Sequence, residues 1–448
     1  RNTKDGYLIE SGFITTDKNI DIPNSNSIWS VSGNNKLTDQ SPVKLSWTNN
    51  QGITFEKVIS LDDKFLFTIK QRVINSTNNE YDFYSYGQII RNEIPFGISN
   101  FYILHEGLLA TLDDELIEED YDDIQEEKFT RTSQKGWLGI SDKFWLTSLI
   151  PPKGREFKTT FDFKEKFRVN FVSTKPLELR GNSTIEDKMD VIVAAKRVDV
   201  IDGYAESLNI DKFDLAIDWG ILYFITRPLF TAIDYFFKIF GNYGLAIIAV
   251  TVCIRLAFFP LANFSFRSMA KMKALQPEQA RLKELHKDDK MALQKATMSL
   301  FKREKVNPMS GCLPILVQIP VFFALYKVLF VTIEMRQMPF YGWVRDLSER
   351  DPTSLFNLFG LLPYDVPSFL MIGAWPVAMG VSMFIQQKLN PAPADPMQAK
   401  IFMFFPLFLT VILAPFPAGL VIYWTFNNIL TMAQQVFIMK RTKVKTTT

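Results

Sequence analysis

The chain has 448 residues, of which 47% are hydrophobic and 14% aromatic, and its 50 Lys and Arg nearly balance its 48 Asp and Glu, for a formal net charge of +2. The even charge excludes a protein built around one basic nucleic-acid surface, and the apolar content excludes a disordered chain. The mean hydropathy of +0.02 lies between the values typical of soluble and membrane proteins. The order of residues indicates two unlike halves rather than one uniform chain.

Residues 1–205 have the pattern of a β-sandwich domain. Polar and apolar residues alternate over several short stretches, and turn residues such as Pro151 and Pro152 separate the stretches. Such alternation indicates half-buried strands, and many strands without helices between them favour two packed antiparallel sheets. The alternating stretches are 52–61, 65–72, 81–91, 136–150, 157–173 and 189–201.

This first half carries no residue pattern of an enzyme. It contains one histidine, His105, but no cysteine, no nucleophile motif and no metal-ligand cluster. The acidic run at 113–127 lacks the glycine of a calcium-binding loop, so it predicts a solvated acidic loop. We therefore expect no catalytic residue, no metal ion and no cofactor.

Residues 206–241 have the composition of amphipathic helices that lie in a membrane interface. Charges recur along an apolar segment that also carries Trp219 and Tyr223, and Pro228 is expected to divide it into two shorter helices. Aromatic side chains of this kind favour the depth of the lipid headgroups. The alternative interpretation is a helix packed against the β-domain.

Residues 242–440 contain five apolar segments that predict membrane spans. The segments are 243–262, 313–333, 369–385, 401–416 and 419–438. The connection at 266–306 predicts a charged hairpin of two amphipathic helices, which is either a solvated connector or a partner-binding element. Its excess of Lys and Arg, together with the basic tail at 441–448, predicts that both are cytoplasmic and that the β-domain lies on the opposite side.

A domain exported across a membrane needs a targeting segment, and this sequence begins at Arg1. We expect a signal or a first transmembrane helix upstream, and a β-domain that is incomplete at its N-terminus. The two cysteines, Cys253 and Cys312, fall in or beside predicted spans. No disulfide is therefore expected in the outer domain.

A charged residue, Arg255, lies inside the first predicted span, roughly 18 Å from its outer end. An Arg at the centre of a span costs about 2.5–3.5 kcal/mol to insert. Either its side chain reaches the inner headgroups, or it faces a cavity that contains water. The second interpretation is supported by Thr251 one turn earlier and by the amides Gln318, Asn427, Asn428, Gln434 and Gln435 in other spans. No Asp or Glu lies deep in a predicted span, so such a cavity would attract a negative charge.

Several stretches resemble the YidC family of membrane-protein insertases. In order between residues 214 and 439 they are GNYGLAIIAVTVCIRLAFFPL, SMAKMKALQPE, KVNPMSGCLPILVQIPVFFALY, DPMQAKIFMFFP and FPAGLVIYWTFNNILTMAQQ, and KGWLGISDKFWLTSLIPP resembles the end of the family's periplasmic domain. The resemblance implies an α+β multi-domain membrane protein, with a periplasmic β-supersandwich followed by a five-helix transmembrane core and a cytoplasmic helical hairpin. The core would enclose a hydrophilic groove that is open to the cytosol and lipid. Arg255 matches the groove arginine, and Thr251 and Trp424 match groove positions.

The function that the resemblance implies is insertion of nascent membrane proteins into the bacterial inner membrane. A short polar terminus would enter the groove toward Arg255, and the substrate's apolar helix would then pass into lipid. No phosphate-binding loop occurs, so we expect no nucleotide hydrolysis. The residues expected in the substrate groove are Arg255, Thr251, Gln318, Asn427, Trp424 and Gln434.

The partners expected from this function are nascent membrane proteins and the lipid bilayer, with no sequence-specific nucleic acid. The ribosome and the general secretion translocon are candidate partners of the basic hairpin and tail. Two other classes stay open at this point. A small-anion transporter or channel would use the same cavity but normally shows an internal repeat, which this sequence lacks. A sugar-binding outer domain would use the helices only as an anchor.

Overall fold

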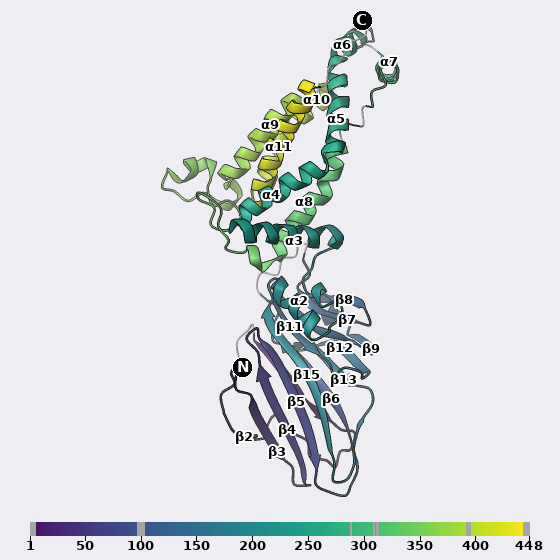
Figure 1. Cartoon of the computed structure of the whole chain (residues 1–448), viewed down its shortest axis with the longest axis vertical. Coiled ribbons are helices and arrows are strands. Elements are labelled where there is room, and N and C mark those ends of the chain that lie inside the picture. Colours follow the sequence, from purple (N-terminus) through teal and green to yellow (C-terminus); the bar gives the residue numbers. More distant parts are fainter. Residues whose placement is uncertain are drawn as a thin grey trace. The chain divides into compact units, whose positions relative to one another are not determined.

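The computed structural model of the chain describes residues 6–95, 104–286, 289–307, 310, 313–390 and 396–441 (Figure 1). The chain divides into two compact units, residues 1–218 with 331–333, and residues 219–330 with 334–448. The first unit is mostly β-sheet and the second is mostly helical. Asp288, Cys312 and residues 442–448 of the predicted basic tail lie outside the described residues.

Two antiparallel sheets form the first unit, as the alternating stretches predict. One sheet has the strand order β1–β6–β13–β12–β9, with β14 beside β6, and the other has the order β2–β3–β4–β5–β15–β11–β10–β7–β8. The strands of the first sheet are β1 (Tyr7–Ile14), β6 (Tyr81–Arg91), β9 (Phe129–Ser133), β12 (Phe157–Lys164), β13 (Lys166–Ser173) and β14 (Leu177–Leu179). The strands of the second are β2 (Ser30–Ser32), β3 (Val43–Thr48), β4 (Ile53–Leu61), β5 (Leu66–Asn75), β7 (Gly107–Leu112), β8 (Glu115–Glu119), β10 (Gly136–Ser141), β11 (Trp145–Ile150) and β15 (Thr184–Ala195).

A layer of polar residues separates two apolar clusters in this unit. One cluster contains Ile69, Ile89 and Met189, and the other contains Phe55, Val73 and Phe83. Between them lie Lys57 on β4, Gln71 on β5 and Asp187 on β15, which are paired in register across the three neighbouring strands. Residues directly opposite each other in a sheet share a face, so these polar side chains face the same side as the flanking core residues.

Two sequence predictions for the first unit are wrong in detail. The stretch 189–201 is not one strand, because β15 ends at Ala195 and the helix α2 (Val198–Ser207) follows. The acidic run at 113–127 is not a plain loop, because it contains β8 and the helix α1 (Tyr121–Glu126). Ile117, Tyr121 and Ile124 are buried there, and this apolar burial orders a segment whose acidic side chains mostly stay exposed.

The helix α3 (Tyr223–Phe240) runs through Pro228 without a break, so the prediction of two shorter helices is wrong. Leu229, Phe230 and Ile233 are buried along one face of this helix. Their packing outweighs the hydrogen bond that Pro228 cannot donate, because most helical stability in proteins comes from burial of an apolar face.

The first predicted span is bent. The helix α4 (Tyr243–Ala257) ends before Phe258, and α5 (Phe259–Ala274) continues at an angle of 67°. Pro260 stands in the first turn of α5, where proline is tolerated, and it prevents a straight continuation of α4. Among the described residues, no single helix has both the length and the hydropathy of a span, and the pair of α4 and α5 passes that test only together.

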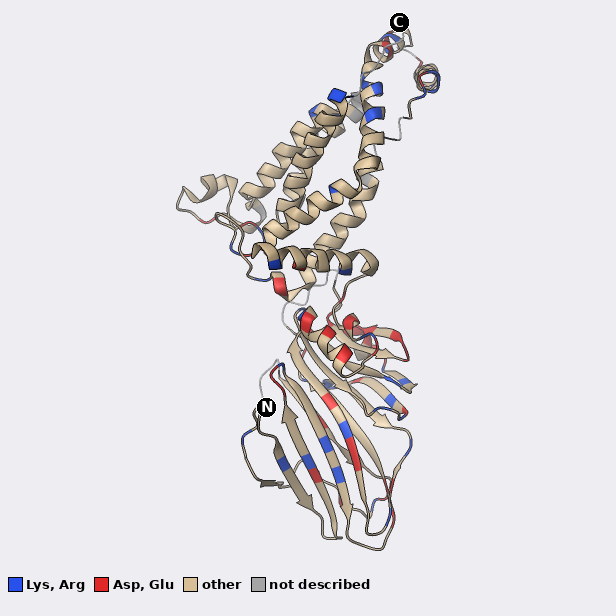
Figure 2. Cartoon of the chain, in the orientation of Figure 1, with Lys and Arg blue, Asp and Glu red and all other residues tan. Residues whose placement is uncertain are grey.

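The remaining helices fall at the predicted apolar segments and in the predicted hairpin. They are α6 (Gln276–Leu285), α7 (Lys290–Arg303), α8 (Leu313–Val331), α9 (Ala374–Leu389), α10 (Pro396–Leu413) and α11 (Ala418–Arg441), with short 3-10 turns η1 (Phe213–Ala216), η3 (Ile333–Met335), η4 (Leu355–Gly360) and η5 (Ser368–Leu370). Lys and Arg concentrate around α5, α6 and α7, whereas α8 to α11 carry few charges (Figure 2). The helical unit is therefore strongly asymmetric in charge.

Candidate functional site

Arg255 joins three helices of the second unit. It lies in the last turn of α4, a helix whose start is capped by the Asn242 side chain through the backbone N–H of Leu245. Its guanidinium donates to the side-chain oxygen of Asn427 on α11, at 2.9 Å from Nε and 2.5 Å from Nη2. Nη2 also donates to the side-chain oxygen of Gln318 on α8, at 3.1 Å. The half-buried cation is thus held by neutral amide oxygens.

Two further polar side chains complete this cluster. The Gln318 amide nitrogen donates to the hydroxyl of Tyr423, a residue of α11 that is 3% exposed. The Gln434 amide nitrogen donates to the backbone oxygen of Arg255 at 3.1 Å. This carbonyl belongs to the end of α4, where carbonyls lack intrahelical partners, so Gln434 also caps the helix.

A narrow cleft opens beside Arg255. It is lined by Ile254, Arg255, Phe258, Leu261, Ala262, Pro314, Val317, Gln318, Val321 and Gln434, and its volume is about 20 Å³. This is room for about one water molecule. The apolar walls come from α4, α5 and α8, and the polar lining residues are Arg255, Gln318 and Gln434.

Four of the six residues predicted for the groove therefore meet in one cluster, namely Arg255, Gln318, Asn427 and Gln434. Thr251 does not join them, because its hydroxyl donates to the Ile247 carbonyl at 2.7 Å inside α4 and the residue is 2% exposed.

Trp424 also makes a different contact from the other predicted residues. Its ring packs edge-on against Phe322 of α8, with the ring centroids 4.7 Å apart. Tyr423 belongs to the polar cluster and was missed by sequence reasoning, which singled out its neighbour Trp424. The only available signal was the mixed apolar and polar character of a Tyr among the amides of α11.

The other amides of α11 face a different helix. Asn428 donates to the Ser382 hydroxyl at 2.9 Å, and Gln435 donates to the Asn390 side-chain oxygen at 3.1 Å. Ser382 belongs to α9 and Asn390 follows it. These hydrogen bonds, the first buried and the second partly buried, hold α11 against α9, so the two polar faces of α11 have different structural roles.

The cluster around Arg255 is suited to receive an anion. Within the described part of the chain, no carboxylate pairs with this arginine, and no three His, Cys, Asp or Glu residues lie close enough to hold a metal ion. A hydrogen bond between two charged groups is stronger than one to a neutral amide. An entering carboxylate can therefore replace Asn427 or Gln318 with a gain in interaction energy.

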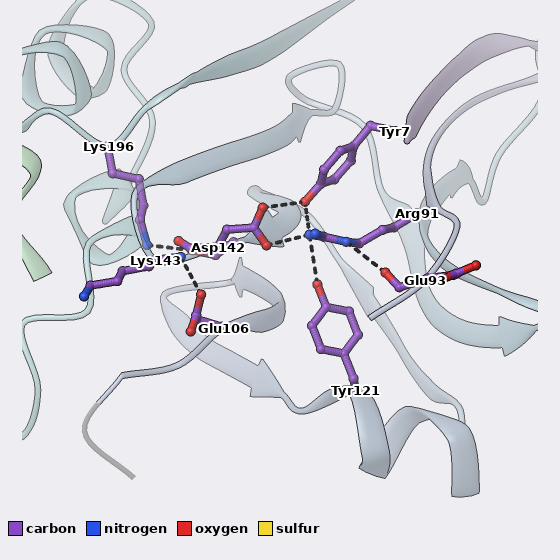
Figure 3. A network of polar contacts seen from close by, with 9 residues as sticks. Tyr7, Arg91, Glu93, Glu106, Tyr121, Asp142, Lys143 and Lys196 are labelled. Atoms are coloured by element: carbon purple, nitrogen blue, oxygen red, sulfur yellow. Dashed lines mark hydrogen bonds and ion pairs between the residues drawn. The ribbon is translucent and has the colours of Figure 1, made fainter. Parts of the chain in front are cut away.

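A second polar network lies in the β-unit (Figure 3). Arg91, which is 2% exposed, pairs with Asp142 at 2.5 Å and also donates to the hydroxyls of Tyr7 and Tyr121. Burial raises the pKa of both tyrosines above its ordinary value, so both hydroxyls stay neutral donors and acceptors. Since the arginine is already neutralised by Asp142, we assign this network a structural role.

The turn after β10, which contains Asp142, also anchors two other parts of the β-unit. The Lys196 ammonium donates to the Ser141 hydroxyl at 2.8 Å, and the backbone N–H of Lys143 donates to the Glu106 carboxylate at 2.8 Å (Figure 3). The turn after β10 therefore connects both sheets with the chain that leads into α2.

Two family models together cover nearly the whole chain. The model described as 60Kd inner membrane protein matches residues 235–446, and the model described as YidC periplasmic domain matches residues 1–232. The chain is therefore of the class of inner membrane proteins that carry a periplasmic domain, and the β-unit is that domain.

Relatives narrow the class further. A protein of Pelagibacter ubique named membrane protein insertase YidC is 74% identical over 447 residues, covering 100% of this chain and 80% of the relative. A protein of the same name in Brucella suis is 48% identical, covering 99% of this chain and 73% of the relative. The chain belongs to the YidC family of membrane protein insertases. A solved structure described as an active YidC insertase aligns with 91% of this chain and 83% of that chain, at 16% identity and a TM-score of 0.41.

Proposed function

We propose that this chain inserts nascent membrane proteins into the bacterial inner membrane by receiving a substrate's short, acidic terminus at Arg255. The observation that carries the proposal is the set of neutral partners around this guanidinium, Asn427 and Gln318. An arginine that is expensive to bury and is not neutralised by a carboxylate is best explained by an anion that comes and goes.

The polar cluster would lower the barrier that a hydrophilic segment meets in the membrane. Each unsatisfied backbone group in hydrocarbon costs several kcal/mol. Amides of Gln318, Asn427 and Gln434 offer hydrogen bonds partway across, so the segment has a shorter apolar distance to cross. No nucleotide hydrolysis is needed in this scheme, because the substrate's own apolar helix gains free energy on entering lipid.

The route into lipid would follow exposed apolar side chains of α8 and α10. On α8 these include Leu316 and Phe323, which are 58% and 55% exposed, and on α10 they include Phe404 and Leu407, which are 60% and 63% exposed. A substrate helix that leaves the cleft between α4 and α8 would meet apolar surface on α8 first. This places the polar and apolar parts of the substrate on different surfaces of the same unit.

The membrane arrangement is part of the same proposal. The bent pair of α4 and α5 together with α8, α9, α10 and α11 would form the five spans, with the β-unit in the periplasm and the basic hairpin of α6 and α7 in the cytoplasm. The concentration of Lys and Arg around the hairpin supports this orientation (Figure 2). The hairpin is then available to the ribosome or the secretion translocon, and α3 would lie in the outer interface, with the exposed Phe224 and Tyr235 at headgroup depth.

Insertion assays with charge variants test the proposal. A single-span substrate with an acidic N-terminal tail is compared with the same substrate carrying a neutral Asn tail, in vesicles that contain the wild type, Arg255→Lys, Arg255→Ala or Arg255→Glu. We expect the acidic tail to be inserted progressively more slowly in that order, while the neutral tail depends less on residue 255. Equal insertion of the acidic tail by the wild type, Arg255→Ala and Arg255→Glu would rule out the charge role.

A further inference from the structure

The side chain of Asp351 is buried in the loop between α8 and α9 and accepts hydrogen bonds on both carboxylate oxygens. Oδ1 accepts from the Trp343 indole nitrogen at 3.0 Å, and from the backbone N–H and hydroxyl of Thr353 at 3.0 and 2.7 Å. Oδ2 accepts from the backbone N–H of Trp375 at 2.9 Å. The residue is 1% exposed. A carboxylate buried this deeply is stable only when such donors replace its water.

These bonds cap the N-terminus of α9 from a distant part of the chain. Trp375 is the second residue of the helix, and the preceding Ala374 N–H donates to the Thr353 hydroxyl at 2.9 Å. The first N–H groups of a helix lack intrahelical partners and carry partial positive charge, so a carboxylate there is stabilising. Gly373 allows the close approach, because a Cβ at that position would lie 2.4 Å from Cγ of Asp351.

The same loop also receives the start of α11. The backbone N–H of Ala418 donates to the Glu349 carbonyl at 2.7 Å, and that of Gly419 donates to the Leu347 carbonyl at 2.9 Å. Ala418 and Leu347 are both 0% exposed. Residues 347–353, which we call the clasp loop, therefore satisfy the first N–H groups of two helices that are not neighbours in sequence.

We infer that Asp351 is a positioning residue of the insertase, which holds the N-terminal ends of α9 and α11 together through the clasp loop and so fixes Asn427 opposite Arg255. The helix α11 carries Tyr423 and Asn427 within its first three turns, and the bond between Asn428 and Ser382 keeps the same part of α11 against α9. A shift of the capped ends would move the amide acceptors away from the guanidinium. The link to insertion rests on the proposed function, whereas the clasp loop itself does not.

Hydrogen exchange and insertion, measured on the full chain in lipid nanodiscs and vesicles, test this inference together. Asp351→Asn replaces one acceptor oxygen by a donor that faces N–H groups. Asp346→Asn is the matched control, because Asp346 directly precedes the clasp loop and, within the described residues, its side chain accepts from the backbone and hydroxyl of Ser348 but from no group of α9 or α11. We expect peptides that contain Trp375 and Gly419 to exchange about tenfold faster in Asp351→Asn, the factor expected when a charge-assisted hydrogen bond is lost. Insertion should fall in Asp351→Asn at unchanged protein level, and Asp346→Asn should match the wild type in both measurements.

The outcomes distinguish the role of Asp351 from the proposed function of Arg255. Unchanged exchange in Asp351→Asn overturns the clasp, and faster exchange with wild-type insertion overturns the positioning role. If Arg255→Ala inserts acidic tails at the wild-type rate, the proposed function fails whatever Asp351→Asn does. Should Asp351→Asn not accumulate, Thr353→Val keeps the carboxylate but removes the acceptor for Ala374, and its exchange at the start of α9 is judged by the same criterion.

Discussion

The guanidinium of Arg255 on α4 and the side-chain oxygen of Asn427 on α11 are joined by two hydrogen bonds across 172 positions of sequence. The two donors are Nε and Nη2, and this pair of bonds to one oxygen, with the bond from Nη2 to Gln318, fixes the plane of the guanidinium. Because that oxygen is neutral, it orients the arginine and leaves its positive charge uncompensated. In this contact Asn427 supplies the orientation of the guanidinium and Arg255 supplies the charge, so a substitution at Asn427 can separate the two.

Asn427→Asp should convert the acceptor into a permanent counter-ion. We expect insertion of a substrate with an acidic tail to slow by about tenfold, which corresponds to about 1.4 kcal/mol in the barrier, since the tail must now displace a carboxylate. A substrate with a neutral tail should be affected less. The rates are measured in vesicles that contain equal amounts of each variant.

Asn427→Ala is the control for this prediction, because it removes the orienting bonds without adding a charge. Its effect on the acidic tail should be smaller than that of Asn427→Asp. If the two variants slow insertion equally for both tails, the amide matters for packing only, and competition for Arg255 is wrong.

The pair of Arg91 and Asp142 should be costly to break from either side. Arg91→Met leaves a carboxylate that is 22% exposed without its cation, and Asp142→Leu leaves an arginine side chain that is 3% exposed. Removing one partner of a buried ion pair costs about 3–5 kcal/mol, whereas replacing both by apolar residues costs much less than the sum. Pulse proteolysis in urea, read from cleavage within residues 6–218, measures the stability of this unit.

An exposed pair provides the comparison. Arg72 and Glu186 lie 3.1 Å apart with side chains 51% and 48% exposed. Arg72→Met should change stability by less than about 1 kcal/mol, because exposed pairs are screened by water. Equal losses for Arg72→Met and Arg91→Met would contradict the structural role given to the network in Figure 3.

Much of the β-unit was predictable because a strand's side-chain alternation is a local property. The stretch 81–91 coincides with β6, and 157–173 contains β12 and β13. The prediction failed where a non-local contact decides the outcome. The helix α3 continues through Pro228 because its buried side chains stabilise it. The acidic run after 113 is ordered by three buried apolar residues, which the alternation pattern does not reveal.

The candidate site was predictable in its residue types and not in its pairings. A charge at Arg255 within an apolar segment is visible in the sequence, as are amides in other segments. Which amide meets it depends on how α4, α8 and α11 pack, and this separates Asn427 from its neighbour Asn428, which faces α9. Tyr423 and the clasp loop around Asp351 could not be found, because their contacts join residues that no short pattern relates.

Stability of the β-unit should rise with pH because of Lys57. Its ammonium donates to the carbonyl and hydroxyl of Ser11, and burial lowers its pKa to about 8, with Glu10 opposing the shift. The ordinary pKa of lysine is 10.5. Between these two values the unfolded chain binds more protons than the folded one, so the free energy of unfolding increases with pH over that window, and below about pH 8 the full cost of burying the charge is present.

The free energy of unfolding of the β-unit should increase by about 1 kcal/mol between pH 7.5 and pH 9, as measured by pulse proteolysis. Lys57→Met should remove this difference and should stabilise the unit most at the lower pH. A wild type and a Lys57→Met variant with parallel pH profiles would show that the lysine keeps an ordinary pKa. The comparison stays below pH 10 because tyrosines such as Tyr86, whose pKa is raised by burial, titrate above it.

The close packing of α9 against α10 should depend on Gly380, which has no side chain. A Cβ added at Gly380 would lie 2.1 Å from the hydroxyl oxygen of Thr410, which is 8% exposed and donates to the Pro406 carbonyl at 2.8 Å. Gly380→Ala must therefore displace the Thr410 side chain or push the helices apart, at a cost of about 1–3 kcal/mol for overpacking. Thr410→Ala makes room for the new methyl group, so the double variant should melt close to Thr410→Ala alone, in thermal scans of the protein in nanodiscs. Insertion by Gly380→Ala should fall equally for acidic and neutral tails, because neither Gly380 nor Thr410 carries a charge. A loss confined to acidic tails, or a double variant no more stable than Gly380→Ala, would contradict this account of the α9–α10 contact.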